Sequence, residues 1–494
     1  MQSTRLIQHL RNYASAGVLS ALVGLVSFPI LTRNLSVADY GIVGLITAST
    51  TLFISIGKLG MQHAVIRFYA PIRNAKIAFN MQQMNSTVSA VFFGLAVLAT
   101  LLFLITGYQI LPGFLQYEDI STLFLLAAGI VFIRILGSGI MNFLRAQQRS
   151  AEVAIAQSLA RFLNLTLILA VVLMTVLEPF SVISSLFFAE LAGVCFVAYQ
   201  YRSDFYFSCQ TVSLKLARIM LIYGLPLMIL ESLSIVLRLS DRYLIEAMLG
   251  VDELGQYSAS YNLTGYLDII ILAAILQAVR PAYMQMWEAH GKSKTSEFLS
   301  HGFYLYIVIG LPFIAMFSVT SPYLLSFLAG PKYAEGTVII PYVALSLWLE
   351  GAMLFLAAGL YIFKNTKVLM FSSLVATFIN LALNLLFIPY FGITGAAAVT
   401  VISYGVFLFA VTLLSFRYVA FAVDLIAALV VMVGSLFVYL ALQYLDFGSD
   451  VLNFVLKGLS GTSVLTLVIW LLVPELRIWV HDLFGKISIR IRMS

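Results

Sequence analysis

The sequence predicts an all-α, polytopic membrane protein of about 14 transmembrane helices. Of its 494 residues, 61% are hydrophobic and only 10% are charged, whereas soluble domains are about 45–50% apolar and about 25% charged. So few polar residues cannot cover the apolar surface in water, which excludes a soluble globular protein. The apolar residues form runs long enough to cross roughly 30 Å of hydrocarbon, without the two-residue alternation of a membrane β-barrel.

Fourteen apolar runs are candidates for transmembrane helices. They start near Tyr13, Tyr40, Met84, Leu123, Ala154, Val182, Ile219, Tyr257, His301, Val338, Val368, Gly395, Leu425 and Gly458. The first run resembles a secretory signal only in its length, because Arg33 and Asn34 follow it without an Ala-x-Ala cleavage pattern. We therefore expect the first run to be retained as a span.

Lysine and arginine residues predict the orientation of the spans, because positive residues in short loops resist translocation. If Met1 is cytoplasmic, the segments on that side hold 21 of the 28 basic residues. The bases expected in outside segments are Arg33, Arg238, Arg242, Lys332 and Lys457. Both termini are therefore expected to be cytoplasmic. The bases are dispersed and form no dense run, so we expect no nucleic acid partner.

An internal repeat is visible at a constant shift. A shift of 214 residues places 35–41 on 249–255 and Tyr69 on Tyr283, and the helix pattern of spans 1 to 6 falls on spans 7 to 12. Because six is an even number, both halves have the same orientation. We expect two six-helix lobes related by a pseudo-twofold axis along the membrane normal, with a cavity between them near mid-membrane.

The repeat divides the chain into four expected segments. Residues 1–200 are the N-terminal six-helix lobe, 201–218 a cytoplasmic linker, and 219–417 the C-terminal six-helix lobe. Residues 418–494 hold helices 13 and 14, expected to pack on the lobes or to line a lipid groove, and a cytoplasmic tail. Within that tail, 479–491 fits either an amphipathic surface segment or a simple charged tail.

The motifs that most membrane-bound enzymes need are missing. The chain lacks Gly-x-x-x-x-Gly-Lys-Ser/Thr, so it has no phosphate loop for ATP. The longest outside connections are expected at 238–256 and 321–337, which leaves no outside domain for a glycosyltransferase, ligase or polymerase site. The five histidines are scattered without metal-ligand spacing. We expect a transporter without catalytic residues, a bound metal or a cofactor.

Residues 384–404 carry the most specific motif. The segment reads NLLFIPYFGITGAAAVTVISY and resembles the signature N-x-x-x-I-P-x-x-G-I-x-G-A-A-x-A-T of the polysaccharide flippases in the multidrug/oligosaccharidyl-lipid/polysaccharide exporter superfamily. Val399 stands where the signature usually has alanine. Residues 29–41 resemble the first outside turn of the same family, and 241–244 followed by Gly255-x-Tyr257 resemble the equivalent of that turn at span 7. The resemblance covers residues 5–417.

The resemblance implies a flippase of the cell inner (plasma) membrane. Its expected cargo is an undecaprenyl-diphosphate-linked oligosaccharide, moved to the outer leaflet by alternating access for lipopolysaccharide O-antigen, capsule or exopolysaccharide assembly. The implied partners are this lipid-linked oligosaccharide, membrane lipid, a polysaccharide polymerase and a chain-length regulator. Two alternatives from the same superfamily stay open, namely a cation-coupled exporter of drugs or small molecules and a flippase for peptidoglycan lipid precursors.

Six ionisable residues deep in the spans are the candidate site residues. They are Arg134, Arg161, Glu190, Glu231, Asp268 and Glu350. Each costs about 2.5–3.5 kcal/mol at the centre of a membrane helix. Such a cost is tolerated where the groups face one another, a water-filled cavity or a charged substrate.

The two signs of charge suggest two roles. We hypothesise that Arg134 and Arg161, with Arg238 nearer the outside, bind the diphosphate through charge-assisted hydrogen bonds. Glu231, Asp268 and Glu350 are candidates for binding a proton or sodium ion that drives the cycle. The competing interpretation is structural pairing inside the first lobe, for example of either arginine with Glu190.

Overall fold

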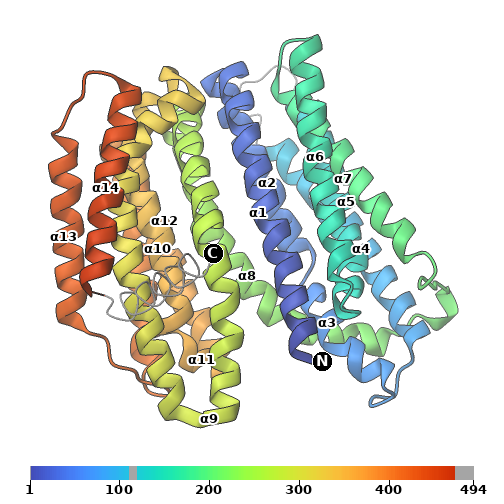
Figure 1. Cartoon of the computed structure of the whole chain (residues 1–494). Helices are drawn as coiled ribbons and strands as arrows, with labels where there is room; N and C mark the ends of the chain where they lie inside the picture. Colours follow the sequence, from blue (N-terminus) through green and yellow to red (C-terminus); the bar gives the residue numbers. More distant parts are fainter. Residues whose placement is uncertain (1, 111–119, 473–494) are drawn as a thin grey trace, which may run out of the picture.

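The chain is a bundle of long helices (Figure 1). The computed structural model describes residues 2–110 and 120–472, and within them the side chains of all residues except 2–16, 108–110, 267–278, 465 and 468–472. Over the described residues the structure contains helices and no β-strand. The tail segment 479–491 lies outside the described residues.

The first seven helices form one side of the molecule. Their bounds are α1 (Gln2–Asn34), α2 (Val37–Gly57), α3 (Met61–Arg73), α4 (Met81–Ile110), α5 (Ile120–Ala146), α6 (Ser150–Met174) and α7 (Pro179–Tyr201). Helix α2 begins where Ser36 Oγ accepts a hydrogen bond from the Asp39 N–H at 3.0 Å. Helices α2 and α3 lie on either side of a bend at Gly60, whose φ of +73° suits glycine.

The remaining helices form the other side of the molecule and its periphery. Their bounds are η2 (Cys209–Thr211), α8 (Leu214–Leu249), α9 (Val251–Ala329), η3 (Pro331–Ile339), α10 (Ile340–Leu356), α11 (Ala358–Ile362), α12 (Thr366–Ser415), α13 (Leu425–Gln443) and α14 (Asp450–Leu472). Helices α9 and α12 each contain two helices, because the chain turns at Gly291 (φ +70°) and Gly392 (φ +58°). Helix α8 begins within the linker expected at 201–218.

The prediction of a polytopic helical membrane protein is confirmed. All the predicted span starts fall within the helices above, with Val338 in η3 directly before α10. By length and composition, 11 helices of the described chain are able to cross a membrane. One of these, α12, holds two of the predicted spans on either side of Gly392. This number covers only the described residues, and side chains in parts of α9 and α14 lie outside them.

Three of the bases expected outside lie within helices instead. Helix α8 continues to Leu249, so the loop expected at 238–256 is wrong for Arg238 and Arg242, and α14 begins at Asp450, ahead of Lys457. Each of these three bases has a partner on another helix. Arg238 pairs with a carboxylate, Arg242 lies over a tyrosine ring and Lys457 meets a tyrosine hydroxyl. These partners allow the helices to continue through residues that a hydropathy pattern places in loops.

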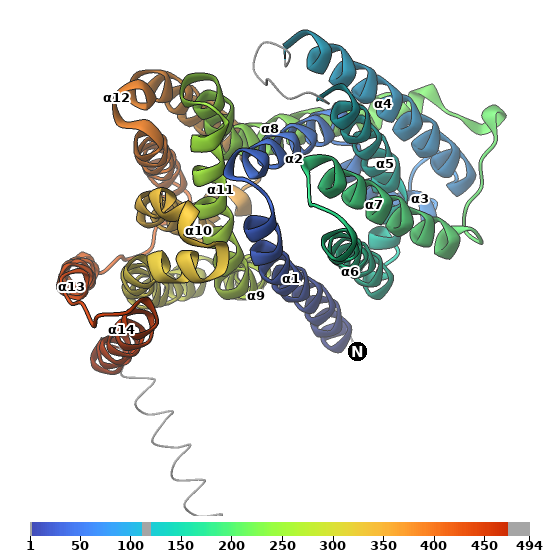
Figure 2. The same ribbon diagram turned by 90° about the horizontal axis from the view of Figure 1, so that it is seen from above.

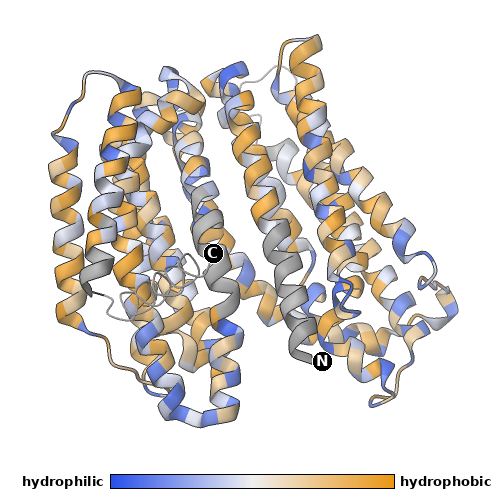
Figure 3. Cartoon of the chain, viewed as in Figure 1, coloured by the Kyte–Doolittle hydropathy of each residue, from blue (hydrophilic) through white to orange (hydrophobic). Residues whose placement is uncertain are grey.

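The helices are arranged in two groups. Seen from above, α1–α7 gather on one side and α9–α12 on the other, with α8 between them and α13 and α14 at the edge (Figure 2). Helices α13 and α14 both pack on α9. Hydrophilic residues gather mainly toward the helix ends, and apolar residues cover much of the helix length between them (Figure 3). We call the face where α1 starts the N-terminal face, and the other end the opposite face.

Residues related by the repeat contact each other across the two groups. A Cβ on Gly41 would lie 2.4 Å from the Val251 carbonyl oxygen, and a Cβ on Gly255 would lie 2.0 Å from the Val37 carbonyl oxygen. The shift of 214 residues relates 37 to 251 and 41 to 255, so each contact is the image of the other. Such reciprocity is the mark of a twofold axis. Only glycine fits at these two positions, because α2 and α9 approach each other backbone to backbone.

The 384–404 motif forms a packing corner. Asn384 is fully buried and donates to the Asn380 side chain at 3.1 Å, which in turn accepts from Ser240 of α8 at 3.1 Å. The chain reverses at Gly392, and a Cβ on Gly395 would lie 2.7 Å from the Phe387 carbonyl oxygen. The motif therefore reports how α12 is built and holds it against α8.

Candidate functional site

A cavity of about 400 Å³ lies among α1, α2, α5, α6 and α7. Four bases and one acid line it, so its formal charge is +3. These residues are Lys58, Arg134, Arg145, Arg161 and Glu190. We call this cavity the basic pocket. Two of the predicted anion-binding residues therefore share one cavity with two further bases.

Small residues bring the pocket's walls close together. A Cβ on Gly137 of α5 would lie 2.5 Å from a methyl group of Val194, and a Cβ on Gly193 of α7 would lie 3.2 Å from Ala160 of α6. Small residues allow helix backbones to approach within the membrane. The close approach of α5 and α7 brings Glu190 within reach of Arg134.

Arg134 is paired inside the pocket. Its Nη2 lies 2.6 Å from Glu190 Oε1, and the two side chains are 22% and 19% exposed. The pairing considered as the competing interpretation is therefore present for Arg134. A guanidinium has five N–H donors, and the bond to Glu190 uses one of them. Arg134 thus keeps donors that a ligand in the cavity can use.

Arg161 has no such pairing. Its side chain is exposed, and among the side chains that the structure describes no hydrogen bond or ion pair includes it. It lies close enough to Tyr266 of α9 to act on that hydroxyl electrostatically. Tyr266 in turn packs edge-on against Phe28 of α1, with ring centroids 6.1 Å apart. Arg161 therefore lies where the basic pocket adjoins the second group of helices.

Lys58 and Arg145 were not among the predicted site residues. Lys58 follows the last residue of α2, with a side chain 16% exposed, and Arg145 Nη1 donates to Asn142 Oδ1 at 3.3 Å. The sequence pattern assigns both to cytoplasmic span ends. The signal for Lys58 is the Leu59-Gly60 pair that follows it, because this pair forms the bend after which the chain continues as α3. Arg145 has no comparable signal.

Glu231 joins the two groups of helices. It belongs to α8 and accepts a hydrogen bond from Gln62 Nε2 at 2.8 Å, while His63 Nε2 lies 3.1 Å and Lys58 Nζ 3.8 Å from its carboxylate. We call these four residues the Glu231 cluster. Beside it, a Cβ on Gly60 would lie 2.0 Å from the carbonyl oxygen of Gly224 in α8. The predicted ion-coupling residue Glu231 therefore takes part in contacts between α3 and α8.

Arg238 and Glu350 are bonded to each other. Arg238 Nη2 of α8 donates to Glu350 Oε1 of α10, and the Tyr404 hydroxyl of α12 lies 3.3 Å from Glu350 Oε2. Arg238 does not line the basic pocket. The structure thus places a predicted anion-binding residue against a predicted ion-coupling residue. The side chain of Asp268 lies outside the described residues.

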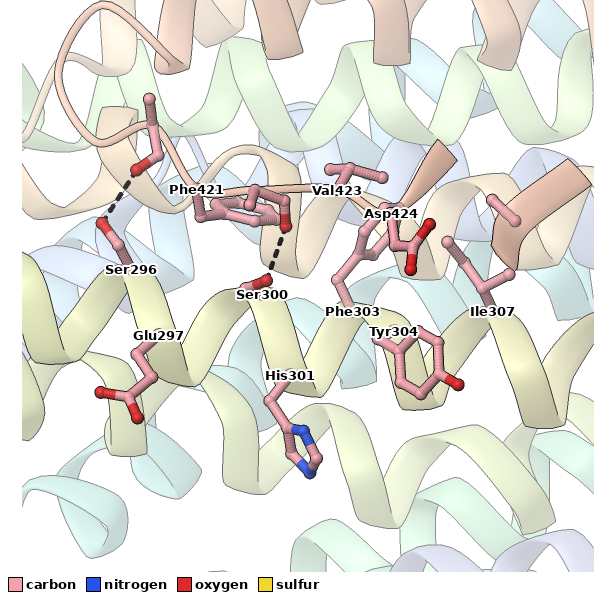
Figure 4. Close-up of a pocket in the computed structure, with 13 residues that line it drawn as sticks. Ser296, Glu297, Ser300, His301, Phe303, Tyr304, Ile307, Phe421, Val423 and Asp424 are labelled. Carbon is pink, nitrogen blue, oxygen red and sulfur yellow. Dashed lines mark hydrogen bonds between the residues drawn. The ribbon is translucent and has the colours of Figure 1, made fainter. Parts of the chain in front are cut away.

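A second cavity, of about 550 Å³, has the opposite charge. It lies between α9 and the segment 420–424, with Ser296 Oγ donating to the Ala420 carbonyl at 2.8 Å and Ser300 Oγ to the Ala422 carbonyl at 2.6 Å (Figure 4). Its ionisable residues are Glu297, His301 and Asp424. Two carboxylates and one histidine do not favour an anionic ligand. Of these two cavities, the basic pocket is the one whose charge favours an anionic ligand.

A protein-family model described as polysaccharide biosynthesis protein matches residues 10–287, more than half of the chain. The chain belongs to this family. The match contains all the residues of the basic pocket and of the Glu231 cluster. The family predicted from the 384–404 motif is thereby confirmed, although that motif itself lies beyond the matched residues. No curated protein matches the chain.

Solved structures with the same fold are transporters and flippases. The chain is similar to the lipid II flippase MurJ in an inward closed conformation, with a TM-score of 0.75, 14% identity, and coverage of 96% of this chain and 99% of MurJ. It is also similar to an inward-facing multidrug resistance transporter of the MATE family in the MOP superfamily, with a TM-score of 0.67, 14% identity, and coverage of 81% and 94%. At this identity the similarity concerns the fold.

Proposed function

We propose that this polysaccharide biosynthesis protein moves an undecaprenyl-diphosphate-linked oligosaccharide across the inner membrane by alternating access. The glycan would serve a surface polysaccharide such as O-antigen, capsule or exopolysaccharide. The observation that carries the proposal is the charge of the basic pocket, where four bases and one acid share a cavity. The family membership and the transporter fold support the same conclusion.

A diphosphate diester has two negative charges and needs several hydrogen-bond donors. Arginine forks bind phosphate oxygens in pairs, and such charge-assisted bonds are about twice as strong as neutral ones. Arg161 offers an unpaired guanidinium, and Arg134 is held in place by Glu190 at 2.6 Å. Glu190 also removes one positive charge from the pocket. We infer that this limits the affinity, so that the cargo is released as well as bound.

Lys58 links the pocket to the contact between the two groups of helices. It lines the basic pocket and also lies 3.8 Å from Glu231 of α8. A ligand changes the conformational equilibrium only if it interacts differently with the two states. We propose that a bound diphosphate draws Lys58 away from Glu231 and so weakens the contact between α3 and α8. Protonation of Glu231 would weaken the same contact, which makes Glu231 a candidate for proton coupling.

Ion coupling has a separate test. Asp268 and Glu350 remain candidates for a proton or sodium site. The carboxylate of Glu350 is paired with Arg238. Transport by Asp268→Asn should become insensitive to the ion gradient in vesicles. Unchanged gradient dependence in that variant would remove Asp268 from the coupling step.

The test of the anion site measures surface polysaccharide export in cells with single substitutions. We expect Arg161→Ala and Arg134→Ala to reduce export at least about tenfold, the loss of one strong charge-assisted interaction. Arg202→Ala is the matched control, because Arg202 lies over the ring of Tyr199 outside the pocket. Normal export by well-expressed Arg134→Ala and Arg161→Ala variants would contradict the proposal.

The formal charge of the basic pocket also favours some of the alternative functions over others. A pocket with a formal charge of +3 repels cationic drugs, so it does not favour a drug exporter. A peptidoglycan lipid precursor also contains a diphosphate and fits the pocket equally well. Deletion of the gene distinguishes these cargoes. Accumulation of lipid-linked surface glycan in the inner leaflet of the deletion strain supports the proposal. Accumulation of peptidoglycan precursor, or sensitivity to cationic drugs with intact surface glycan, would replace it.

A further inference from the structure

A cavity of about 710 Å³ lies among α9, η3, α10, α13 and α14, apart from the basic pocket. One lysine lines it, together with the side chains of several tyrosines, serines and apolar residues. It includes both appended helices, α13 and α14, for which the proposed function has no role. None of its residues belongs to the basic pocket or to the Glu231 cluster.

Among the described residues that line this cavity, Lys457 is the only basic one. It is 2% exposed, its Nζ lies 2.9 Å from the Tyr323 hydroxyl, and it lies over the ring of the same tyrosine at 5.0 Å from the centroid. None of the ion pairs found in residues 2–110 and 120–472 includes it. The exposed carboxylate of Asp446 acts on Lys457 electrostatically but forms no ion pair with it, and a buried ammonium without a contacting counter-ion is costly. The two N–H donors that Tyr323 does not use therefore call for an anionic partner.

Two buried hydroxyls line the same cavity. Ser318 of α9 is 6% exposed and Ser435 of α13 is 8% exposed, and neither Oγ has a hydrogen-bond partner. Buried polar groups are nearly always hydrogen-bonded. Lys457, Ser318 and Ser435 thus present one cation and two hydroxyl donors to the same space.

The position along the helices indicates which part of a lipid would reach this space. Lys457 is seven residues into α14 and Tyr323 is six residues before the end of α9, so both lie about 10 Å below the helix ends at the opposite face. Leu436 and Met432 line the cavity seven and eleven residues before the end of α13, so Leu436 lies at the depth of Lys457 and Met432 one turn further inward; they are 56% and 50% exposed. A polar group is therefore followed inward by an apolar surface suited to acyl chains.

We propose that this cavity binds the phosphodiester group of an anionic membrane phospholipid in the leaflet at the opposite face. Lys457 supplies the charge, Ser318 and Ser435 donate to phosphate oxygens, and the acyl chains lie along Leu436 and Met432. A phosphodiester has one negative charge, which one lysine balances, whereas the diphosphate of the cargo has two. The bound lipid joins α13 and α14 to α9 and α10.

The experiment is native mass spectrometry of the full-length protein with phosphatidylglycerol or phosphatidylethanolamine at equal concentration. The wild type should retain phosphatidylglycerol in preference to the zwitterionic lipid. Lys457→Met should bind phosphatidylglycerol at least about tenfold more weakly. Lys294→Met is the control, because Lys294 is an exposed lysine whose partner is Glu297, and it should bind like the wild type.

A second variant covers the case in which Lys457→Met does not fold. Ser435→Ala removes one hydroxyl from the cavity and should weaken phosphatidylglycerol binding several-fold while leaving a folded protein. Equal phosphatidylglycerol binding by the wild type and the folded variants would overturn the proposal. Equal binding of both lipids by the wild type would do the same. Tighter binding of an isoprenoid diphosphate than of phosphatidylglycerol would contradict the charge argument.

Discussion

Arg134 and Arg161 line one cavity but have different electrostatic surroundings. Arg134 is paired with Glu190 at 2.6 Å and both side chains are about one-fifth exposed. Arg161 is exposed and adjoins Tyr266 of the other group of helices. A substitution at Arg134 therefore changes both binding and stability, whereas one at Arg161 changes binding alone.

The difference between the surroundings of Arg134 and Arg161 predicts that their substitutions have different effects on thermal unfolding. Arg134→Ala leaves the Glu190 carboxylate unpaired in a low-dielectric site and should destabilise the protein by roughly 1–3 kcal/mol, less than for a fully buried pair. Arg161→Ala should stay within about 0.5 kcal/mol of the wild type. Melting temperatures in detergent compare the two variants. A larger decrease for Arg161→Ala than for Arg134→Ala would show that the pairing is assigned to the wrong arginine.

Arg134→Lys tests geometry against charge. Lysine keeps the positive charge but loses the planar fork that binds two oxygens at once. We expect partial polysaccharide export from Arg134→Lys and none from Arg134→Ala at matched expression. Export at the wild-type level from both would indicate that neither charge nor geometry at this position matters for transport.

At the scale of elements, one close approach between the two groups of helices is the contact of α2 with α9. Gly41 and Gly255 are required there because their missing side chains make room for the opposing carbonyl groups. The Glu231 cluster joins α3 to α8 on the side of the N-terminal face. The first contact combines the backbone approach with a neutral side-chain bond from Asn262 to Tyr40. The second includes titratable and charged side chains beside the backbone approach of Gly60 to Gly224. We infer that the second contact is the one that changes during transport.

Gly255→Ala tests the backbone contact. The new Cβ would lie 2.0 Å from the Val37 carbonyl oxygen, so α2 and α9 must separate at a cost of about 1–3 kcal/mol. We expect a lower melting temperature and reduced export. Gly265→Ala is the matched control on the same helix, because nothing lies within 4 Å of its added Cβ. Equal melting temperatures for the two variants would contradict the close approach.

The sequence is informative for elements and less so for the site. The span starts and the corner of Pro389, Gly392 and Gly395 were predictable, because each depends on residues close together in the chain. The pairing of Arg238 and the burial of Lys457 were not, since their partners Glu350 and Tyr323 lie 112 and 134 residues away. A hydropathy pattern includes the free-energy cost of placing each charge in the membrane. It does not include the distant partner that offsets this cost. Arg134 and Arg161 were found because their neighbours are continuously apolar.

At the scale of the whole molecule, the charge distribution predicts how the chain is oriented. The α3–α4 connection contains Asn74 and follows Arg67 and Arg73, at the same end as the start of α1 (Figure 1). The connection between α13 and α14 contains Ser449 and lies at the other end. We expect the first connection in the cytoplasm and the second outside.

Cysteine labelling of intact cells tests this orientation. In a background in which Cys195 and Cys209 are replaced, Ser449→Cys should react with an impermeant thiol reagent and Asn74→Cys should not. Both should react after permeabilisation. Labelling of Asn74→Cys in intact cells would reverse the orientation, and with it the direction of transport that we propose.

The reciprocal glycine contact has a consequence for how a chain of this kind can originate. Because Gly41 faces Val251 and Gly255 faces Val37, a shorter chain holding a single six-helix unit would meet a second copy of itself through the same glycine. Such a unit would form a symmetric homodimer with both copies oriented alike in the membrane. Joining the two copies through one connecting segment then requires no new surface between them. The two halves differ in their charges. A fused pair can acquire such differences, whereas the two subunits of a homodimer have the same sequence.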